Sequence, residues 1–193
     1  MDHTFFGVQV VIAANPKDGL RRRLHDLLAS AGSEQLPDEK RAFYKRFTAL
    51  VNESMPIFEL GFWDLVRGGR ADEEFETWCA EIEGSMATEE EELAGEADEV
   101  FRLSTEKDYI IVTMLFLVVR GGTADQAIGR RADIPEAEWH TRETFAKLIA
   151  TPPLLPFETV RADAVYLMPG NDDDGISADD LYGEGYKYLR MLH

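Results

Sequence analysis

The longest apolar run of the chain covers residues 109–119 and has no polar alternation. Apolar residues at both odd and even positions predict a strand that is covered on both faces, so we expect this run to be the central strand of its sheet. Two apolar segments, 8–13 and 164–168, predict strands that flank it. The alternating segment 100–103 is a candidate for a further strand. We therefore expect a small sheet of three or four strands.

Helical spacing, with apolar residues three and four positions apart, dominates the rest of the chain. Pro56 must kink or end one long helical region, because proline lacks an N–H group and clashes with the preceding turn. Capping boxes predict a helix start at Thr123 and another at Ser177. The predicted helices cover residues 20–28, 37–55, 57–66, 72–86, a short segment from 123, 135–150 and a last segment after 177.

The order of these elements predicts a single α+β domain over residues 1–193. We expect the helices of 37–86 to form a separate layer on the sheet. Residues 71–108 form an acidic helical or linker segment, and within them 88–99 is either an extension of the preceding helix or a loop. With 45% hydrophobic residues, the chain has enough apolar surface to fold, and its composition excludes the collagen, coiled-coil and disulfide-scaffold classes.

Charge is distributed unevenly around a formal net value of −17. Residues 1–70 are nearly neutral, with 10 basic and 9 acidic side chains, whereas 71–108 carry 2 basic and 15 acidic ones. A surface this acidic repels phosphates, so we do not expect nucleic acid as a partner. The acidic run Glu89, Glu90, Glu91 and Glu92 is either a solvated face or a docking patch for a basic partner protein.

The location that we expect is the cytoplasm. The start of the chain, Met1-Asp2, lacks the basic lead of a signal peptide. Its most apolar run has 11 residues, whereas a membrane-spanning helix needs about 20. Cys79 is the only cysteine, so no disulfide forms within the chain, and its acidic neighbours argue against a reactive thiolate.

Signatures of catalysis are absent from the sequence. No two of its four histidines have the spacing of metal ligands, and it has no HExxH pair, GxSxG elbow or phosphate-binding GxxxxGK[ST] loop. We therefore expect a protein without catalytic activity rather than an enzyme, and no tightly held cofactor.

Two segments are candidates for ligand binding. The first leaves the apolar strand and enters a helix, and it could hold a phosphate or carboxylate through Arg120, Gly121, Gly122 and Thr123. Its alternative role is a turn that needs glycine at positive φ. The second is the densest set of oxygen ligands, and it could hold calcium or magnesium, although its spacing is not that of an EF-hand. Its acids are Asp172, Asp173, Asp174, Asp179 and Asp180.

Three segments resemble a known family. Residues 108–115 are similar to the "YIVVTLLV" strand of family 1517 of the domains of unknown function, and 8–12 to its opening "LQV" strand. Residues 164–192 resemble its closing segment, in which an "EVLWTPQ" strand precedes a D-x-L-S turn and a helix. Tyr166 stands where the family often has tryptophan, and 37–95 match poorly.

The family occurs in bacteria and chloroplasts, and its plant branch is associated with the acclimation of photosynthesis to fluctuating light. The transit, glycine-rich and membrane segments of the chloroplast members are missing here, so the resemblance implies a cytoplasmic bacterial relative. The family offers no catalytic residues to carry over. The function that we expect is an interaction or regulatory module that acts through protein–protein contacts. The alternative is a binder of a small anionic ligand or a divalent cation.

Overall fold

The computed structural model describes residues 2–14, 19–32, 36–94, 108–170 and 175–193, and it confirms the α+β class. Its strands form one antiparallel sheet in the order β4-β3-β1-β2-β5. The strands are β1 (His3–Ala13), β2 (Phe58–Arg67), β3 (Tyr109–Val119), β4 (Val160–Met168) and β5 (Arg190–Met191). The helices of the described part are α1 (Leu20–Ser30), α2 (Pro37–Glu53), α3 (Ala71–Ala94), α4 (Thr123–Ala132), α5 (Arg142–Ile149) and α6 (Ala178–Leu181).

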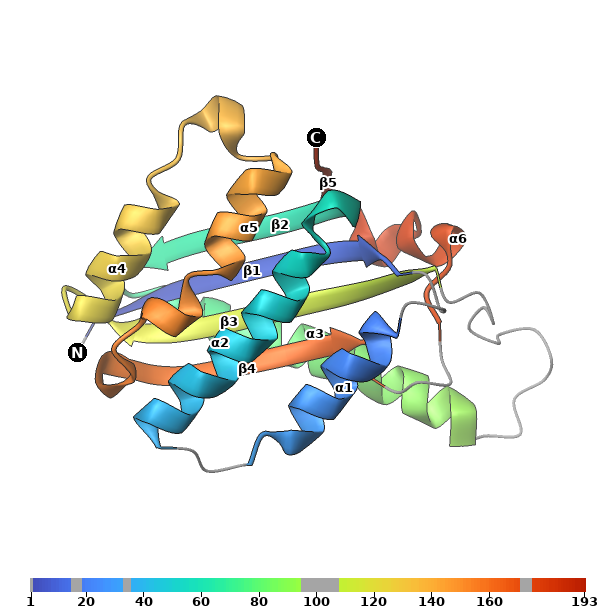
Figure 1. The fold of residues 1–193 in the computed structure, drawn as a ribbon, viewed down its shortest axis with the longest axis horizontal. Helices are drawn as coiled ribbons and strands as arrows, with labels where there is room; N and C mark the ends of the chain where they lie inside the picture. The colour runs from blue at the N-terminus through green and yellow to red at the C-terminus, as the bar shows by residue number, and fades with distance from the viewer. Residues whose placement is uncertain (1, 15–18, 33–35, 95–107, 171–174) are drawn as a thin grey trace.

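Helices cover the sheet on both faces (Figure 1). The helices α1, α2, α4 and α5 lie on one face, and α3 lies on the other. Alternate side chains of β1 divide between the two cores, with Phe6 and Val8 in the first and Phe5 and Val11 in the second. The domain therefore has two hydrophobic cores that share one sheet.

Strand β3 lies in the interior of the sheet, as its unbroken apolar run predicted. Nine of its 11 residues are buried, because both of its faces are covered. Its neighbours are β1 and β4, which confirms the predicted flanking strands. Two details of the predicted sheet were wrong. The sheet has five strands instead of three or four, and its middle strand is β1 instead of β3.

The predicted helix over 57–66 is strand β2. Its residues are apolar on both sides, as in β3, because both faces of the sheet are covered. Trp63 and Leu65 face the first core, whereas Phe62 and Val66 face the second. The helices of 37–86 consequently do not form one layer: α2 and α3 lie on opposite faces of the sheet.

Other element boundaries also differ from the predictions. The predicted helix over 135–150 is a 3₁₀ turn at Glu136–Glu138 followed by α5. The last predicted helix is the single turn α6, and the chain then forms β5 instead. Helix α3 continues to Ala94, which resolves the first part of 88–99 as helix. The candidate strand at 100–103 lies outside the described residues.

One of the two predicted capping boxes is confirmed. The Ser177 hydroxyl accepts from the Asp180 N–H at 3.2 Å, while the Asp180 carboxylate accepts from the Ser177 N–H at 2.8 Å. At α4 the N-cap is Gly122 instead of Thr123, so the predicted box does not form, and the Thr159 hydroxyl accepts from the Ala124 N–H at 3.3 Å instead. None of the described helices has the length and apolar character needed to cross a membrane.

Candidate functional site

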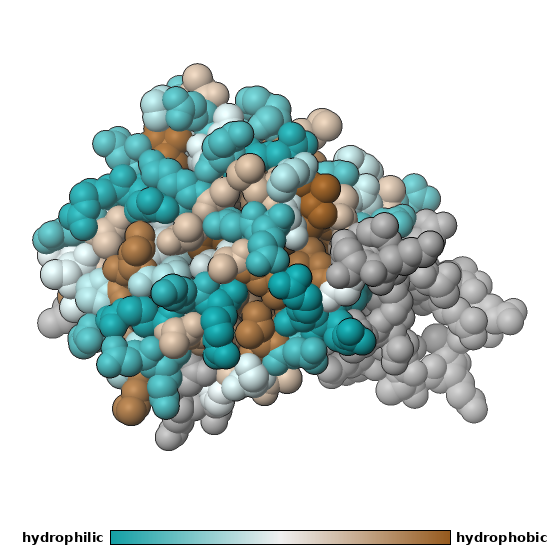
Figure 2. Space-filling view, viewed as in Figure 1, coloured by the Kyte–Doolittle hydropathy of each residue, from teal (hydrophilic) through white to brown (hydrophobic). Residues whose placement is uncertain are grey.

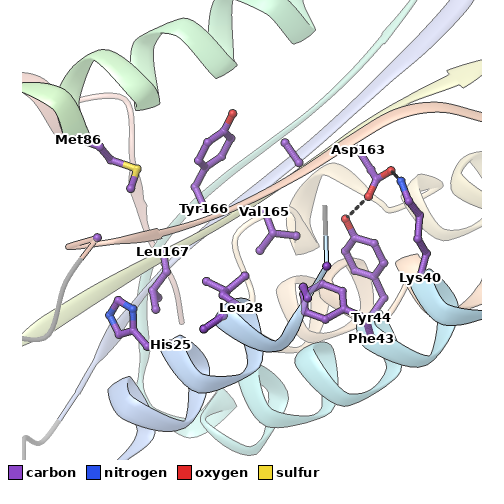
Figure 3. Close-up of a pocket in the computed structure, with 15 residues that line it drawn as sticks. His25, Leu28, Lys40, Phe43, Tyr44, Met86, Asp163, Val165, Tyr166 and Leu167 are labelled. Carbon is purple, nitrogen blue, oxygen red and sulfur yellow. Dashed lines mark hydrogen bonds and ion pairs between the residues drawn. The ribbon is translucent and has the colours of Figure 1, made fainter. Parts of the chain in front are cut away.

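A groove of about 570 Å³ runs beside β4, the strand at one edge of the sheet (Figure 3). Its lining includes five consecutive residues of β4, from Asp163 to Leu167. Helices α1 and α2 supply one wall, and Met86 of α3 lies on the other side. We call this site the β4-edge groove.

The five consecutive lining residues show that the groove reaches the edge of the strand. Side chains alternate along a strand, so Val165 and Leu167 point toward α1 whereas Tyr166 points toward α3 (Figure 3). A groove that touches both sets must lie against the edge between the two faces. Among the described residues, β4 pairs only with β3, and most of its side chains are half-buried rather than buried.

Apolar side chains form the base of the groove. Leu28 from α1 and Phe43 from α2 lie beside Val165 and Leu167 of β4. The molecular face that carries α1 and α2 is mostly hydrophilic, and hydrophobic residues show in the gaps between its helices (Figure 2). The groove thus offers an apolar surface next to an open strand edge.

One end of the groove is closed by a polar cluster that joins α2 to β4. Lys40 forms an ion pair with Asp163, and the Tyr44 hydroxyl donates a hydrogen bond of 2.9 Å to the same carboxylate. Tyr44 is only 1% exposed. Burial raises the pKa of the Tyr44 phenol well above its usual range, and the Asp163 carboxylate raises it further. Tyr44 is therefore a donor at neutral pH and holds the position of Asp163.

The opposite side of β4 carries a second polar cluster. The Tyr166 hydroxyl donates to the Glu83 carboxylate of α3 at 2.7 Å. Burial, together with hydrogen bonds to Cys79 and Glu83, raises the pKa of Tyr166. Burial also raises the pKa of the Cys79 thiol, against a smaller lowering by Tyr166. The thiol is therefore protonated at neutral pH, in line with the prediction that it is not a reactive thiolate.

The predicted anion-binding loop at 120–123 has partners of its own. The Gly121 N–H donates to the Asp125 carboxylate at 2.8 Å, and the Gly122 N–H donates to the Val119 carbonyl. Gly121 has φ +75°, the backbone conformation that the alternative role as a turn required. Arg120 donates to the Asp2 carboxylate at 3.3 Å. An anion at this loop would have to displace Asp125, so anion binding here stays a prediction.

The remaining predicted residues fall only partly within the described chain. Asp172, Asp173 and Asp174 lie outside it, while Asp180 is occupied as the capping residue of α6 and Asp179 is exposed. No group of three or more histidine, cysteine, aspartate or glutamate side chains in the described residues is arranged to hold a metal ion. The backbone of the run from Glu89 to Glu92 belongs to α3. The metal site and the docking patch stay predictions.

The β4-edge groove itself was not predicted. Most of its lining comes from residues 25–44 and 163–170, which are more than 100 positions apart, and Met86 comes from a third segment. The only local signal was the strand at 164–168, and that signal does not tell whether a strand lies inside a sheet or at its edge.

Comparison with known proteins finds no family model, no curated protein and no solved structure that matches this chain. The resemblance to family 1517 therefore stays a prediction from the residues.

Proposed function

We propose that this chain is a non-enzymatic interaction module that binds an extended segment of a partner protein along β4. The observation that carries this proposal is the β4-edge groove, in which five consecutive residues of an edge strand line an open cavity. An edge strand presents backbone N–H and C=O groups that have no strand partner on their outer side. An added strand satisfies those groups, and this pairing is a common mode of peptide recognition.

The lining of the groove defines the chemistry of the partner segment. Backbone pairing provides affinity for any extended chain, whereas side-chain pockets select the sequence. Leu28, Phe43 and Val165 offer an apolar surface on the α1–α2 side of the edge. A segment that presents apolar side chains at every second position fits this surface. Five residues of strand span about 17 Å, which sets the length of the contact.

The Lys40–Asp163 pair limits where such a segment can lie. Charged side chains that point inward from an edge strand discourage unspecific pairing with other strands. Asp163 is held by Lys40 and Tyr44, so it marks one end of the binding edge. The open part of the edge then covers residues 164–167.

The first test is selection from a library of random linear peptides on the immobilised full chain. Peptides that bind should share apolar residues at alternate positions. When such a peptide binds, hydrogen exchange of the β4 amides at 160–168 should slow, because they gain partners or lose access to water. A copy of the peptide with N-methyl groups on alternate amides should lose binding, since it cannot pair its backbone.

Two leucine variants provide a matched control. Leu28 lines the groove, whereas Leu154 is 59% exposed and is not part of the lining. Leu28→Lys should weaken binding at least tenfold, and Leu154→Lys should leave it unchanged. Binding that tolerates N-methylation and Leu28→Lys, or that protects amides elsewhere in the chain, would overturn the proposal.

A further inference from the structure

A second cavity lies on the opposite face of the sheet, under α3. It has a volume of about 340 Å³, within the usual range of small-molecule sites. Aromatic side chains dominate its wall: Phe62 from β2, Trp78 from α3, and Tyr186 and Tyr188 from the segment before β5. We call this cavity the aromatic pocket.

The aromatic side chains are packed against one another. The rings of Phe62 and Trp78 are stacked with centroids 5.6 Å apart, and Tyr188 meets Phe62 edge-on at the same distance. Each ring carries a negative electrostatic potential on its face. Such a set of rings attracts a positively charged group that has lost its water.

A buried amide forms a polar point in the lining. Gln9 is 1% exposed, and its Nε2 donates to the Thr113 hydroxyl at 2.9 Å. Its Oε1 accepts a hydrogen bond of 2.7 Å from the Tyr188 hydroxyl. These two bonds fix the orientation of the Gln9 carboxamide. Its oxygen uses one lone pair for Tyr188 and can accept a second hydrogen bond with the other. An amide held in this way on a sheet is a preorganised group for a ligand.

The charge of the lining favours a cation. The described lining residues include Glu81, and none of them is a lysine, arginine or histidine. Glu81 has no ion-pair partner within the described part of the chain. Burial raises the pKa of Tyr188, the hydrogen bond to Gln9 lowers it, and the charge of the Glu81 carboxylate raises it. The net charge of −17 adds a long-range attraction for cations.

We propose that the aromatic pocket binds an organic cation, in which an ammonium group carries an apolar substituent. The aromatic rings and the Glu81 carboxylate surround the charge, while Ile82 and Met168 contact the apolar part. This site is separate from the β4-edge groove, since the two share no lining residue in the part of the chain that the structure describes. The two proposals can therefore fail independently.

The test compares a cation with a neutral molecule of the same shape. Choline and 3,3-dimethylbutan-1-ol differ in the charged nitrogen and are nearly equal in size. Calorimetric titration of the full chain should give choline at least tenfold higher affinity than the alcohol. Benzylammonium serves as a second probe, and tighter binding of it than of choline would indicate N–H donation to Gln9 and Ser85.

Two glutamate variants of α3 separate the pocket from the general charge of the protein. Both Glu81 and Glu73 are exposed, but only Glu81 lines the pocket, and Glu73 lies in the first turn of the same helix. Glu81→Gln should weaken binding of the cation at least fivefold, while Glu73→Gln should not change it. Equal affinity for the cation and the alcohol, an equal effect of both variants, or no binding of either cation would overturn the proposal.

Discussion

Asp163 joins the edge strand to the helix layer, because one carboxylate bonds both Lys40 and Tyr44 of α2. Asp163→Ala would leave the buried Tyr44 hydroxyl without its acceptor. An unsatisfied buried group costs about 1–3 kcal/mol, and we expect a loss of that size in the free energy of unfolding. Urea denaturation measures it.

Two controls accompany this variant. Asp163→Asn keeps a carbonyl oxygen for Tyr44 and should cost less. Asp38→Ala removes an exposed pair with Arg41, and such pairs contribute about 0–1 kcal/mol. A variant Asp163→Ala that is as stable as Asp38→Ala would contradict the role assigned to the cluster.

Gly61 of β2 is a glycine because an aromatic ring occupies the place of a side chain. A Cβ at this position would overlap the ring of Phe145 from α5. We expect Gly61→Ala to destabilise the protein by about 1–3 kcal/mol, since the ring must shift in a closely packed core. Gly69, in the turn before α3, has no described atom within 4 Å of that position and no positive φ, so Gly69→Ala should stabilise by about 0.4–1 kcal/mol. Thermal denaturation of the two variants compares them, and shifts of the same sign would refute this explanation.

At the scale of elements, β3 supports both cores at once. Leu115 and Phe116 are neighbours in sequence, both are 0% exposed, and they face opposite sides of the sheet. We expect Leu115→Ala to cost about 2–5 kcal/mol and Phe116→Ala about 3–5 kcal/mol. A substitution of the exposed Arg161 of β4 by alanine provides a control, because surface substitutions usually change stability by less than about 0.5 kcal/mol. Urea denaturation that leaves either β3 variant at native stability would contradict the two-core description.

The same physical pattern was interpreted correctly for β3 and wrongly for β2. Both strands are apolar on two faces, but β3 is a long run with several β-branched residues, which identifies a strand. Strand β2 contains Glu59, Gly61 and Asp64 and directly follows a 3₁₀ turn that contains Pro56, so its apolar residues also fit the start of a helix. A bulge in the pairing of β1 with β2, at Val11/Ile12, further disturbs the alternation.

The candidate site was less predictable than the fold. Strand formation is a local property, and the segment 164–168 was recognised from its own residues. The order of strands depends on contacts between distant segments, and this order alone makes β4 an edge. The loop at 120–123 shows the converse case, since Asp125 lies within the predicted helix and its bond to the Gly121 N–H had no sequence signal.

At the scale of the whole molecule, the sheet separates two surfaces with different chemistry. The β4-edge groove opens at the first core, where α1 and α2 belong to the nearly neutral part of the chain. The aromatic pocket lies in the second core under α3, which belongs to the acidic part. Tyr166 of β4 is bonded to α3, so one strand contacts both layers. Gln9 belongs to β1, the middle strand of the sheet, and it lines the aromatic pocket but not the groove.

Three tyrosines with raised pKa values make the stability of both layers sensitive to alkaline pH. Burial raises the pKa of Tyr44 in the first core, and of Tyr166 and Tyr188 on the other side of the sheet. In the unfolded chain these phenols ionise near pH 10, whereas in the native protein they keep their protons to higher pH. Above pH 10 the unfolded state therefore binds fewer protons than the native state. The free energy of unfolding must then fall as pH rises.

Tyr44 should contribute a measurable part of this fall. Tyr44→Phe removes one phenol whose pKa differs between the two states, so its free energy of unfolding should fall less steeply above pH 10 than that of the unchanged protein. All other ionisable groups are common to the two proteins, so the difference in slope isolates Tyr44. Urea denaturation at a series of pH values on both sides of pH 10 measures the two slopes. Equal slopes would mean that the Tyr44 phenol ionises as readily in the native protein as in the unfolded chain, contrary to its burial against Asp163.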